Sequence, residues 1–170
     1  NLPLLRQIAG YRVPVVLSTA MCTMAEVHEA VRTLRDAGVT DLVVMQCTGN
    51  YPAALEDSNL RVLPRYRAEL QCLVGYSDHT AELINPIAAT AIGACMYEKH
   101  FTLDRAMPGP DHRMSLPPAE LRETIAAIRQ TERALGIADK RVLPSEEENR
   151  AKLRKSLVAA TAIPRGVPIT

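Results

Sequence analysis

Four short apolar runs, each followed by a segment with helical character, constrain the fold of this chain more than any other feature. They are rich in Val, Leu, Met and Cys and cover residues 13–19, 41–48, 70–77 and 93–100. Most are apolar at successive positions, which is typical of strands in a parallel sheet that is covered on both faces. We therefore expect a repeated strand–helix unit of the (β/α)₈ barrel or doubly wound type.

The segments between and after these runs carry helix signals. Thr23 and Glu26 are spaced as a capping box, which predicts a helix start there. Asn85 is expected to cap a second helix that has Pro86 at its first position. Further helices are expected over residues 59–69, over residues 118–136, and from Ser145, which is spaced as a capping box with Glu148, to about Lys155.

The number of strand–helix units indicates half a barrel. A (β/α)₈ barrel needs eight strands and about 250 residues, whereas this chain of 170 residues offers four such runs. A dinucleotide-binding fold has little support because no GxGxxG motif follows the first run. We expect residues 1–136 to form the barrel half and 137–155 a linker. Residues 156–170 would begin a second domain, with a strand over 156–163.

Composition and charge exclude several functional classes. The chain has 20 Lys and Arg and 19 Asp and Glu, so its net charge of +1 gives no basis for binding nucleic acid or an anionic membrane. No apolar run approaches the roughly 20 residues of a membrane span, and the first residues lack a signal-peptide pattern. The 4 cysteines form no CxxC pair, which favours reduced thiols in a cytoplasmic protein.

Polar, chemically capable residues follow the third and fourth runs, in VGYSDHT and MYEKHFT. Residues two apart share a face of a strand, so Ser77 and His79 should point the same way, as should Glu98 and His100. The carboxyl ends of parallel barrel strands carry the active site, so we expect these four side chains to meet at one mouth. Polar groups expected to approach from the preceding strands are Ser18 or Thr19, Gln46, Thr48 and Asn50.

Two imidazoles at neighbouring strand ends suit a divalent metal ion. His79 and His100 alone would make an open site of the catalytic kind, because structural zinc sites are closed by four protein ligands. The alternative is that each histidine is simply bonded to a backbone carbonyl. Glu98 argues for a site, because a buried carboxylate is costly without a partner. Asp78 and Lys99 are expected on the opposite face.

Over essentially its whole length the chain resembles the sialic acid synthase family, which includes N-acetylneuraminate, N,N'-diacetyllegionaminate and pseudaminate synthases and related spore-coat polysaccharide proteins. The resemblance is carried, in order, by LSTAM, QCTGNYP, VGYSDHT, EKHFTLDRAMPGPDH and PSEEENRAKLRKSLVA. It implies a TIM barrel, of which residues 1–136 would be the C-terminal half. It also implies a linker over 137–155 and, from residue 156, the start of a truncated antifreeze-like (SAF) domain.

The resemblance also implies an activity. Family members condense phosphoenolpyruvate with an N-acetylated amino sugar, such as N-acetylmannosamine or a diacetamido relative, to a nine-carbon 2-keto acid and phosphate. By motif, His79 and His100 would bind Mn²⁺ or Mg²⁺ and act with Glu98 in catalysis. The residues implied to bind phosphoenolpyruvate are Ser18, Asn50 and Ser77, and those implied to lie near the sugar are Tyr51 and Asp111. The full-length protein would be a homodimer.

Two alternatives stay open at this point: a truncated, non-catalytic half-barrel, and a diverged metal-dependent barrel enzyme. The family's phosphate-binding lysines and a proposed catalytic glutamate belong to the N-terminal barrel half, so we expect the isolated 170 residues to be inactive. Asp111 lies in the polar sequence PGPDH, where a solvated turn explains it equally well. The sequence names neither the acceptor sugar nor the metal, although imidazole ligands favour Mn²⁺ over Mg²⁺.

Overall fold

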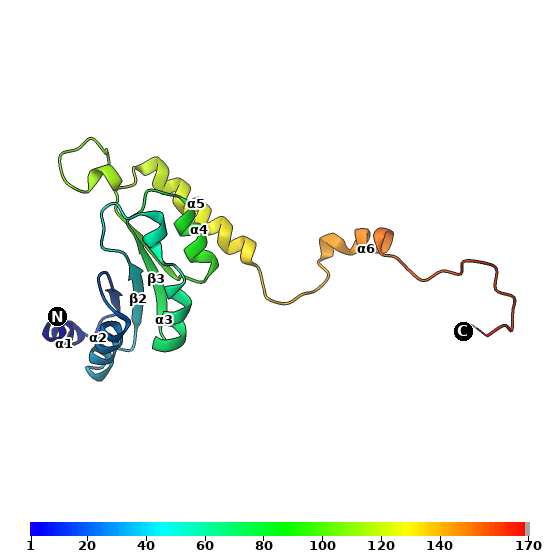
Figure 1. The fold of residues 1–170 in the computed structure, drawn as a ribbon, viewed down its shortest axis with the longest axis horizontal. Helices are drawn as coiled ribbons and strands as arrows, with labels where there is room; N and C mark the ends of the chain where they lie inside the picture. The colour runs from blue at the N-terminus through cyan, green and yellow to red at the C-terminus, as the bar shows by residue number, and fades with distance from the viewer. Residues whose placement is uncertain (169–170) are drawn as a thin grey trace. The chain divides into compact units, whose positions relative to one another are not determined.

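A four-stranded parallel sheet organises the chain (Figure 1). The computed structural model describes residues 1–168, and the chain divides into two compact units, Asn1–Gly136 and Ile137–Thr170. The strands of the first unit lie in the order β1-β2-β3-β4. They are β1 (Val15–Ser18), β2 (Leu42–Cys47), β3 (Leu73–Asp78) and β4 (Met96–Lys99). The four predicted strands and the half-barrel are confirmed, although each strand begins one to three residues later than predicted.

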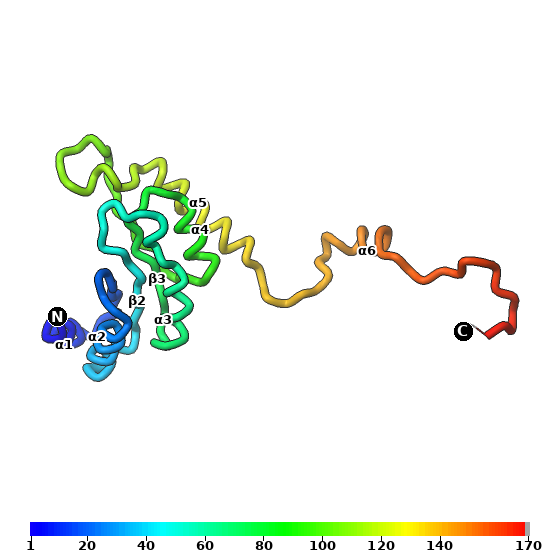
Figure 2. The backbone as a smooth tube through the Cα atoms, in the orientation of Figure 1, coloured from blue at the N-terminus to red at the C-terminus, as the bar shows by residue number. Residues whose placement is uncertain are grey.

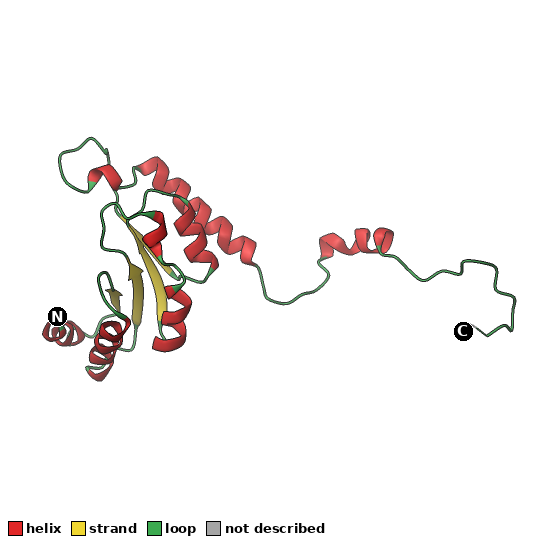
Figure 3. Cartoon of the chain, in the orientation of Figure 1, coloured by secondary structure: helices red, strands yellow, loops and turns green. Residues whose placement is uncertain are grey.

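Helices alternate with the strands, as the barrel prediction requires (Figure 3). Figure 1 shows α3 and α4 along one side of the strands and α5 beside α4. The α-helices of this unit are α1 (Leu2–Ala9), α2 (Met24–Asp36), α3 (Val62–Leu70), α4 (Ile84–Ala91) and α5 (Pro118–Leu135), and the short 3₁₀ helices are η1 (Leu55–Ser58) and η2 (His112–Met114). Within residues 1–168, every helix is too short or too polar to serve as a membrane span.

Helix starts follow the local sequence in one case and not in another. Thr23 and Glu26 form the predicted capping box at the start of α2. The predicted cap at Asn85 is wrong, because α4 already begins at Ile84. Asn85 lies inside its first turn, where the buried amide donates hydrogen bonds to Ser58 Oγ and Thr80 Oγ1, each at 2.9 Å. These partners satisfy the buried Nδ2 donor, which would be costly to leave unpaired.

The two faces of the sheet differ because successive side chains of a strand point to opposite sides. One face packs against the helices and forms the core, and its fully buried side chains are Val44, Val74 and Tyr76. The other face carries exposed apolar side chains, namely Val16, Leu73 and Met96. Because of this alternation, Ser77 and Glu98 lie on the less covered face, at the ends of β3 and β4.

The second unit contains η3 (Pro144–Glu146) and α6 (Glu147–Leu153). The predicted capping box at Ser145 and Glu148 is wrong: Glu146 instead accepts a hydrogen bond from the Leu143 N–H at 2.9 Å, just before α6. The predicted strand over 156–163 is also wrong, since these exposed residues form neither helix nor strand. A strand needs a neighbouring strand to pair its backbone groups, and the described part of this unit contains none. The linker and second-domain assignments stay predictions, and residues 169–170 lie outside the described part.

Candidate active site

Two neighbouring strand ends bring together the polar groups that the sequence singles out. Ser77 of β3 is the ladder partner of Glu98 of β4, and its hydroxyl donates a hydrogen bond to Glu98 Oε1 at 2.6 Å. Just beyond the ladder, the ring centroids of His79 and His100 lie 5.2 Å apart. Two of the expected approaches are therefore present in the structure: Ser77 with Glu98, and His79 with His100. Glu98 is exposed rather than buried, so its partner Ser77, and not the cost of burial, supports its place in the site.

The buried imidazole of His79 is oriented by the end of the preceding strand. Its Nδ1 lies 2.7 Å from the carbonyl oxygen of Thr48 and 3.8 Å from Cys47 Sγ. Because a carbonyl oxygen only accepts, this contact needs a proton on Nδ1, and the neutral ring then keeps a free lone pair on Nε2. Metal-binding histidines are commonly oriented in this way. The alternative interpretation, a histidine that is simply bonded to a backbone carbonyl, explains the contact of Nδ1 but gives no role to Nε2.

Tyr51 and Asn50 follow β2, and Tyr51 reaches the site from that side, whereas Asn50 lines a cavity whose walls include neither histidine. The Tyr51 ring lies 4.1 Å from the His79 ring and 5.7 Å from the His100 ring, measured between centroids, and is itself exposed. Asn50 is exposed and, with Thr48, lines a cavity of about 550 Å³ between the ends of β1 and β2 and helix α3. The structure therefore places the Tyr51 ring beside both histidines, and its role towards the sugar stays a prediction.

Asp111 approaches from the long loop after β4, which Figure 2 shows in yellow-green. Its Oδ2 lies 3.7 Å from Nδ1 of His100. The loop is anchored at both ends: the Leu116 N–H donates to the His100 carbonyl at 2.9 Å, and Arg105 forms two 2.6 Å hydrogen bonds to the carboxylate of Glu120 on α5. Asp111 thus belongs to an anchored loop beside a site histidine, which favours a site role over a simple solvated turn.

Ser18 lies farther away than the other predicted residues. It is exposed at the end of β1, with Met45 of β2 as its ladder partner. Within the part of the chain that is described, no hydrogen bond joins Ser18 to Ser77 or to either histidine. The neighbouring Thr19 is buried and turned to the helix layer, where its hydroxyl contacts the Met45 carbonyl at 2.8 Å and Tyr66 Oη at 3.0 Å. The structure therefore does not bring Ser18 into the group around the histidines.

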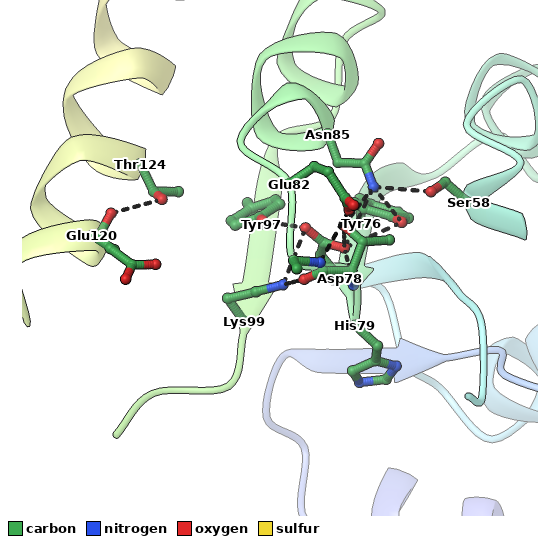
Figure 4. A network of polar contacts seen from close by, with 12 residues as sticks. Ser58, Tyr76, Asp78, His79, Glu82, Asn85, Tyr97, Lys99, Glu120 and Thr124 are labelled. Carbon is green, nitrogen blue, oxygen red and sulfur yellow. Dashed lines mark hydrogen bonds and ion pairs between the residues drawn. The ribbon is translucent and has the colours of Figure 1, made fainter. Parts of the chain in front are cut away.

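A buried polar network lies on the opposite face of the same two strand ends (Figure 4). The Asp78 carboxylate is completely buried and lies 3.5 Å from Nζ of Lys99, while Tyr97 donates to Asp78 Oδ2 at 2.5 Å. Burial lowers the pKa of Lys99 and raises the pKa of Tyr97. Burial also raises the pKa of Tyr76 to about 12. The sequence predicted that Asp78 and Lys99 lie on the face opposite the histidines, but not that they pair with each other. The signal that could have indicated the pairing is that each residue immediately precedes a histidine.

The residues present fit an open metal site better than a closed one. Among residues 1–168, no three His, Cys, Asp or Glu side chains are grouped so that they could hold a metal ion. His79 and His100 remain a pair, and because Nδ1 of His79 faces the Thr48 carbonyl, Nε2 is the ring nitrogen that would face a metal ion. Two imidazoles with other positions left to water or substrate is an arrangement of catalytic type. The metal and the roles of the individual residues stay predictions.

Comparison with known proteins shows which family this arrangement belongs to. The profile of the NeuB family matches residues 1–140. The N,N'-diacetyllegionaminic acid synthase of Legionella pneumophila is 38% identical over 100% of this chain and 49% of its own length. The N-acetylneuraminate-9-phosphate synthase of Homo sapiens is 39% identical, over 100% of this chain and 47% of its own length. The chain thus spans about half the length of these relatives.

A solved structure agrees with these sequence matches. The crystal structure of the N-acetylneuraminic acid (sialic acid) synthetase from Leptospira borgpetersenii superposes with a TM-score of 0.82 at 29% identity, covering 92% of this chain and 55% of that one. The family profile covers the whole strand–helix unit, and both curated relatives match end to end along this chain. This chain therefore belongs to the NeuB family.

Proposed function

We propose that the protein condenses phosphoenolpyruvate with an N-acetylated amino sugar to a nine-carbon 2-keto acid and releases phosphate. The observation that carries the proposal is the meeting of Ser77, Glu98, His79 and His100 at the carboxyl ends of two adjacent parallel strands, where barrel enzymes hold their active sites. The synthases among its relatives support the same class of reaction. N-acetylmannosamine and its diacetamido relatives are the acceptors proposed.

The reaction forms a bond between C3 of phosphoenolpyruvate and the aldehyde carbon of the sugar, while water adds to C2 and phosphate leaves. The amide of Asn50 is a donor suited to carboxylate and phosphate oxygens. Ser77, whose single hydroxyl proton is directed to Glu98 in this structure, and Ser18 are assigned to the same substrate. Lys99 does not serve this purpose, because its ammonium group is directed to Asp78 on the other face. The cations that a phosphate ester requires must therefore come from other residues of the complete protein.

The histidine pair and Glu98 are assigned to the chemical step. His79 and His100 would hold a Mn²⁺ or Mg²⁺ ion, which when bound supplies a Lewis acid for the aldehyde or for the attacking water. Imidazole ligands favour Mn²⁺. Glu98, which already accepts a hydrogen bond from Ser77, is placed to accept a proton at its carboxylate.

The sugar is assigned to the side of the site formed by Tyr51 and Asp111. The exposed ring of Tyr51 lies over both histidines and offers an apolar face and a hydroxyl to a pyranose or open-chain sugar. The carboxylate of Asp111, 3.7 Å from His100 Nδ1, would accept a hydrogen bond from a sugar hydroxyl. The proposal extends to a cytoplasmic homodimer of the complete protein, with the SAF domain beginning at residue 156.

The test measures phosphate release from phosphoenolpyruvate by the protein produced from its complete gene. Mn²⁺ is supplied, and N-acetylmannosamine and its diacetamido derivatives are compared as acceptors. The double variant His79→Ala/His100→Ala is measured beside His28→Ala, a matched control whose exposed ring bonds only to Glu69 at 3.0 Å.

The proposal is supported if phosphate release depends on an acceptor, persists in His28→Ala and is lost in the double variant. The acceptor that gives this result identifies the sugar. If the folded protein releases no phosphate with any acceptor, the proposal fails and a non-catalytic or diverged barrel is favoured. The 170 residues expressed alone are expected to be inactive, and measurable turnover by them would contradict that expectation.

A further inference from the structure

A buried ion pair lies directly behind the two site histidines. Asp78 and Lys99 are the last ladder partners of β3 and β4, and each immediately precedes a histidine. Their side chains are 0% and 4% exposed, and Asp78 Oδ2 lies 3.5 Å from Nζ of Lys99. Figure 4 shows Lys99 and Tyr97 directed to Asp78, while the ring of His79 points away from them. The proposed chemistry gives none of these buried groups a role.

Lys99 contacts the residues on both sides of His79. Its ammonium group pairs with the Asp78 carboxylate and also donates a hydrogen bond to the carbonyl oxygen of Thr80. The amine comes from β4, where the next residue is His100. One side chain therefore links the backbone around His79 to the strand end that carries His100.

Asp78 fixes the same backbone from within its own strand. Its Oδ1 accepts hydrogen bonds from the Thr80 N–H and the Thr80 hydroxyl, each at 2.8 Å. A carboxylate that accepts from the residue two positions on closes an Asx-type turn, here with His79 at its centre. Tyr97 of β4 donates to the other carboxylate oxygen at 2.5 Å. The turn at His79 is thus tied to β4 through a second contact.

No ladder pairing of β3 with β4 extends to the histidines themselves, since both strands end one residue earlier. Their backbone carbonyls are instead bonded to other segments: His79 accepts from the Ala53 N–H and His100 from the Leu116 N–H, each at 2.9 Å. On the buried face, the Asp78–Thr80–Lys99 network therefore links the two histidine-bearing backbones beyond the end of the ladder.

We propose that Asp78 and Lys99 are positioning residues that set the separation and orientation of the His79 and His100 rings. Assigning those rings to a metal ion rests on the proposed function, but the separation itself is a property of this chain. A purely structural ion pair would lower stability when removed and would leave the ring positions unchanged. Loss of an outer residue that orients a metal ligand typically weakens metal binding by about 10–100-fold.

The test uses the protein from its complete gene and two variants of the pair. Lys99→Met removes the ammonium group at similar length, and Asp78→Asn keeps the shape of the carboxylate and an acceptor for Thr80. Tyr66→Phe is the matched control, because it removes one buried hydrogen bond, to Thr19 at 3.0 Å, on other elements. Circular dichroism and thermal unfolding establish folding, and Asp78→Asn decides the test if Lys99→Met does not fold.

Two readouts separate positioning from stability. The first is the dissociation constant for Mn²⁺ alone, measured by calorimetry. The second is the set of NMR signals from ¹³C-labelled histidine rings, assigned by substitution, with exposed His28 as the internal reference. We expect both variants to weaken Mn²⁺ binding about 10–100-fold and to shift the His79 and His100 signals. Tyr66→Phe is expected to lower the melting temperature without either effect.

Wild-type Mn²⁺ affinity and unchanged ring signals in the folded variants would overturn the inference, and so would equal shifts in Tyr66→Phe. Failure of the proposed function is a separate result. If the wild-type protein releases no phosphate and binds no Mn²⁺, that function fails, while the ring signals of the metal-free variants still decide whether the pair positions the histidines.

Discussion

The hydroxyl of Ser77 and the carboxylate of Glu98 lie 2.6 Å apart on paired positions of β3 and β4. This contact joins the two strand ends on the face that carries the histidines, as the Asp78–Lys99 pair joins them on the other face. Glu98 is therefore held in place before any substrate binds. The hydroxyl occupies one position on Oε1, so the other carboxylate lone pairs can still accept a proton.

Replacing Glu98 by glutamine tests this role. Glu98→Gln keeps the size of the side chain and its contact with Ser77 but removes the charge, so phosphate release should fall by roughly 10²–10⁴-fold if the carboxylate accepts a proton. Steady-state assays measure kcat and KM, with Glu123→Gln on the exposed face of α5 as the control. A kcat within twofold of the wild-type value would remove Glu98 from the chemical step.

Removing the metal should abolish turnover. Treatment with a chelator is expected to stop acceptor-dependent phosphate release, and added Mn²⁺ should restore it, because the proposed ion would be held at an open site by the two imidazoles alone. His100→Ala should need at least about tenfold more Mn²⁺ for half-maximal rate. Full activity in metal-free protein would contradict the assignment of His79 and His100.

Gly75 is expected to tolerate no side chain. A Cβ there would lie 2.9 Å from the Met96 carbonyl oxygen and 3.2 Å from Met45 Cγ, so Gly75→Ala should cost about 1–3 kcal/mol in the free energy of unfolding. Gly49→Ala is the matched control, since its Cβ would approach side-chain atoms rather than backbone, the nearest being Cγ of the exposed Met21 at 3.1 Å. Denaturant unfolding measures both, and equal stability of the two variants would refute the prediction.

Stability should fall at alkaline pH through Tyr76. Burial raises its pKa to about 12 from the ordinary 10.0. The unfolded chain therefore loses the phenolic proton first, and the contribution of Tyr76 is complete below pH 10 and is lost as the pH rises towards 12. The effect is on the order of 2–3 kcal/mol. Urea unfolding between pH 9 and pH 11.5 measures this effect. The free energy of unfolding should decline less steeply with pH in Tyr76→Phe than in the wild-type protein, and an equally steep decline would contradict the raised pKa of Tyr76.

Tyr11→Phe is the control for this experiment. The Tyr11 side chain is 67% exposed in the folded chain, so this substitution removes a phenol without touching a buried one. The free energy of unfolding of Tyr11→Phe should fall with pH as steeply as that of the wild-type protein. The comparison isolates the buried phenol from the general effect of raising the net negative charge.

The sheet and the site face followed from sequence because they depend on local periodicity. Apolar runs at successive positions marked all four strands, and the two-residue period placed Ser77 and Glu98 on one face. Asn85 was misassigned because its preference for a cap was outweighed by buried partners on other elements. Local sequence also suggested a strand over 156–163, but a strand forms only where another strand pairs with it.

The contacts that sequence reasoning missed join residues far apart in the chain. Nothing near His79 indicates that the Thr48 carbonyl will contact its ring, because Thr48 follows another strand, β2. The pairing of Asp78 with Lys99 likewise depends on the register of β3 against β4. Such contacts are set by strand register, which alternation along a single strand does not reveal.

The alternation of Ser77, Asp78 and His79 makes this strand end intolerant of insertions and deletions. If one residue were added or removed before Ser77, each side chain at this strand end would point to the opposite face of the sheet. The Asp78 carboxylate would then face the site, and the His79 imidazole would enter the buried network. No single substitution would repair both faces at once. Changes in length at the mouth should therefore be confined to the connecting loops, such as residues 101–111, where chain can be gained or lost without altering which way the strand-end groups point.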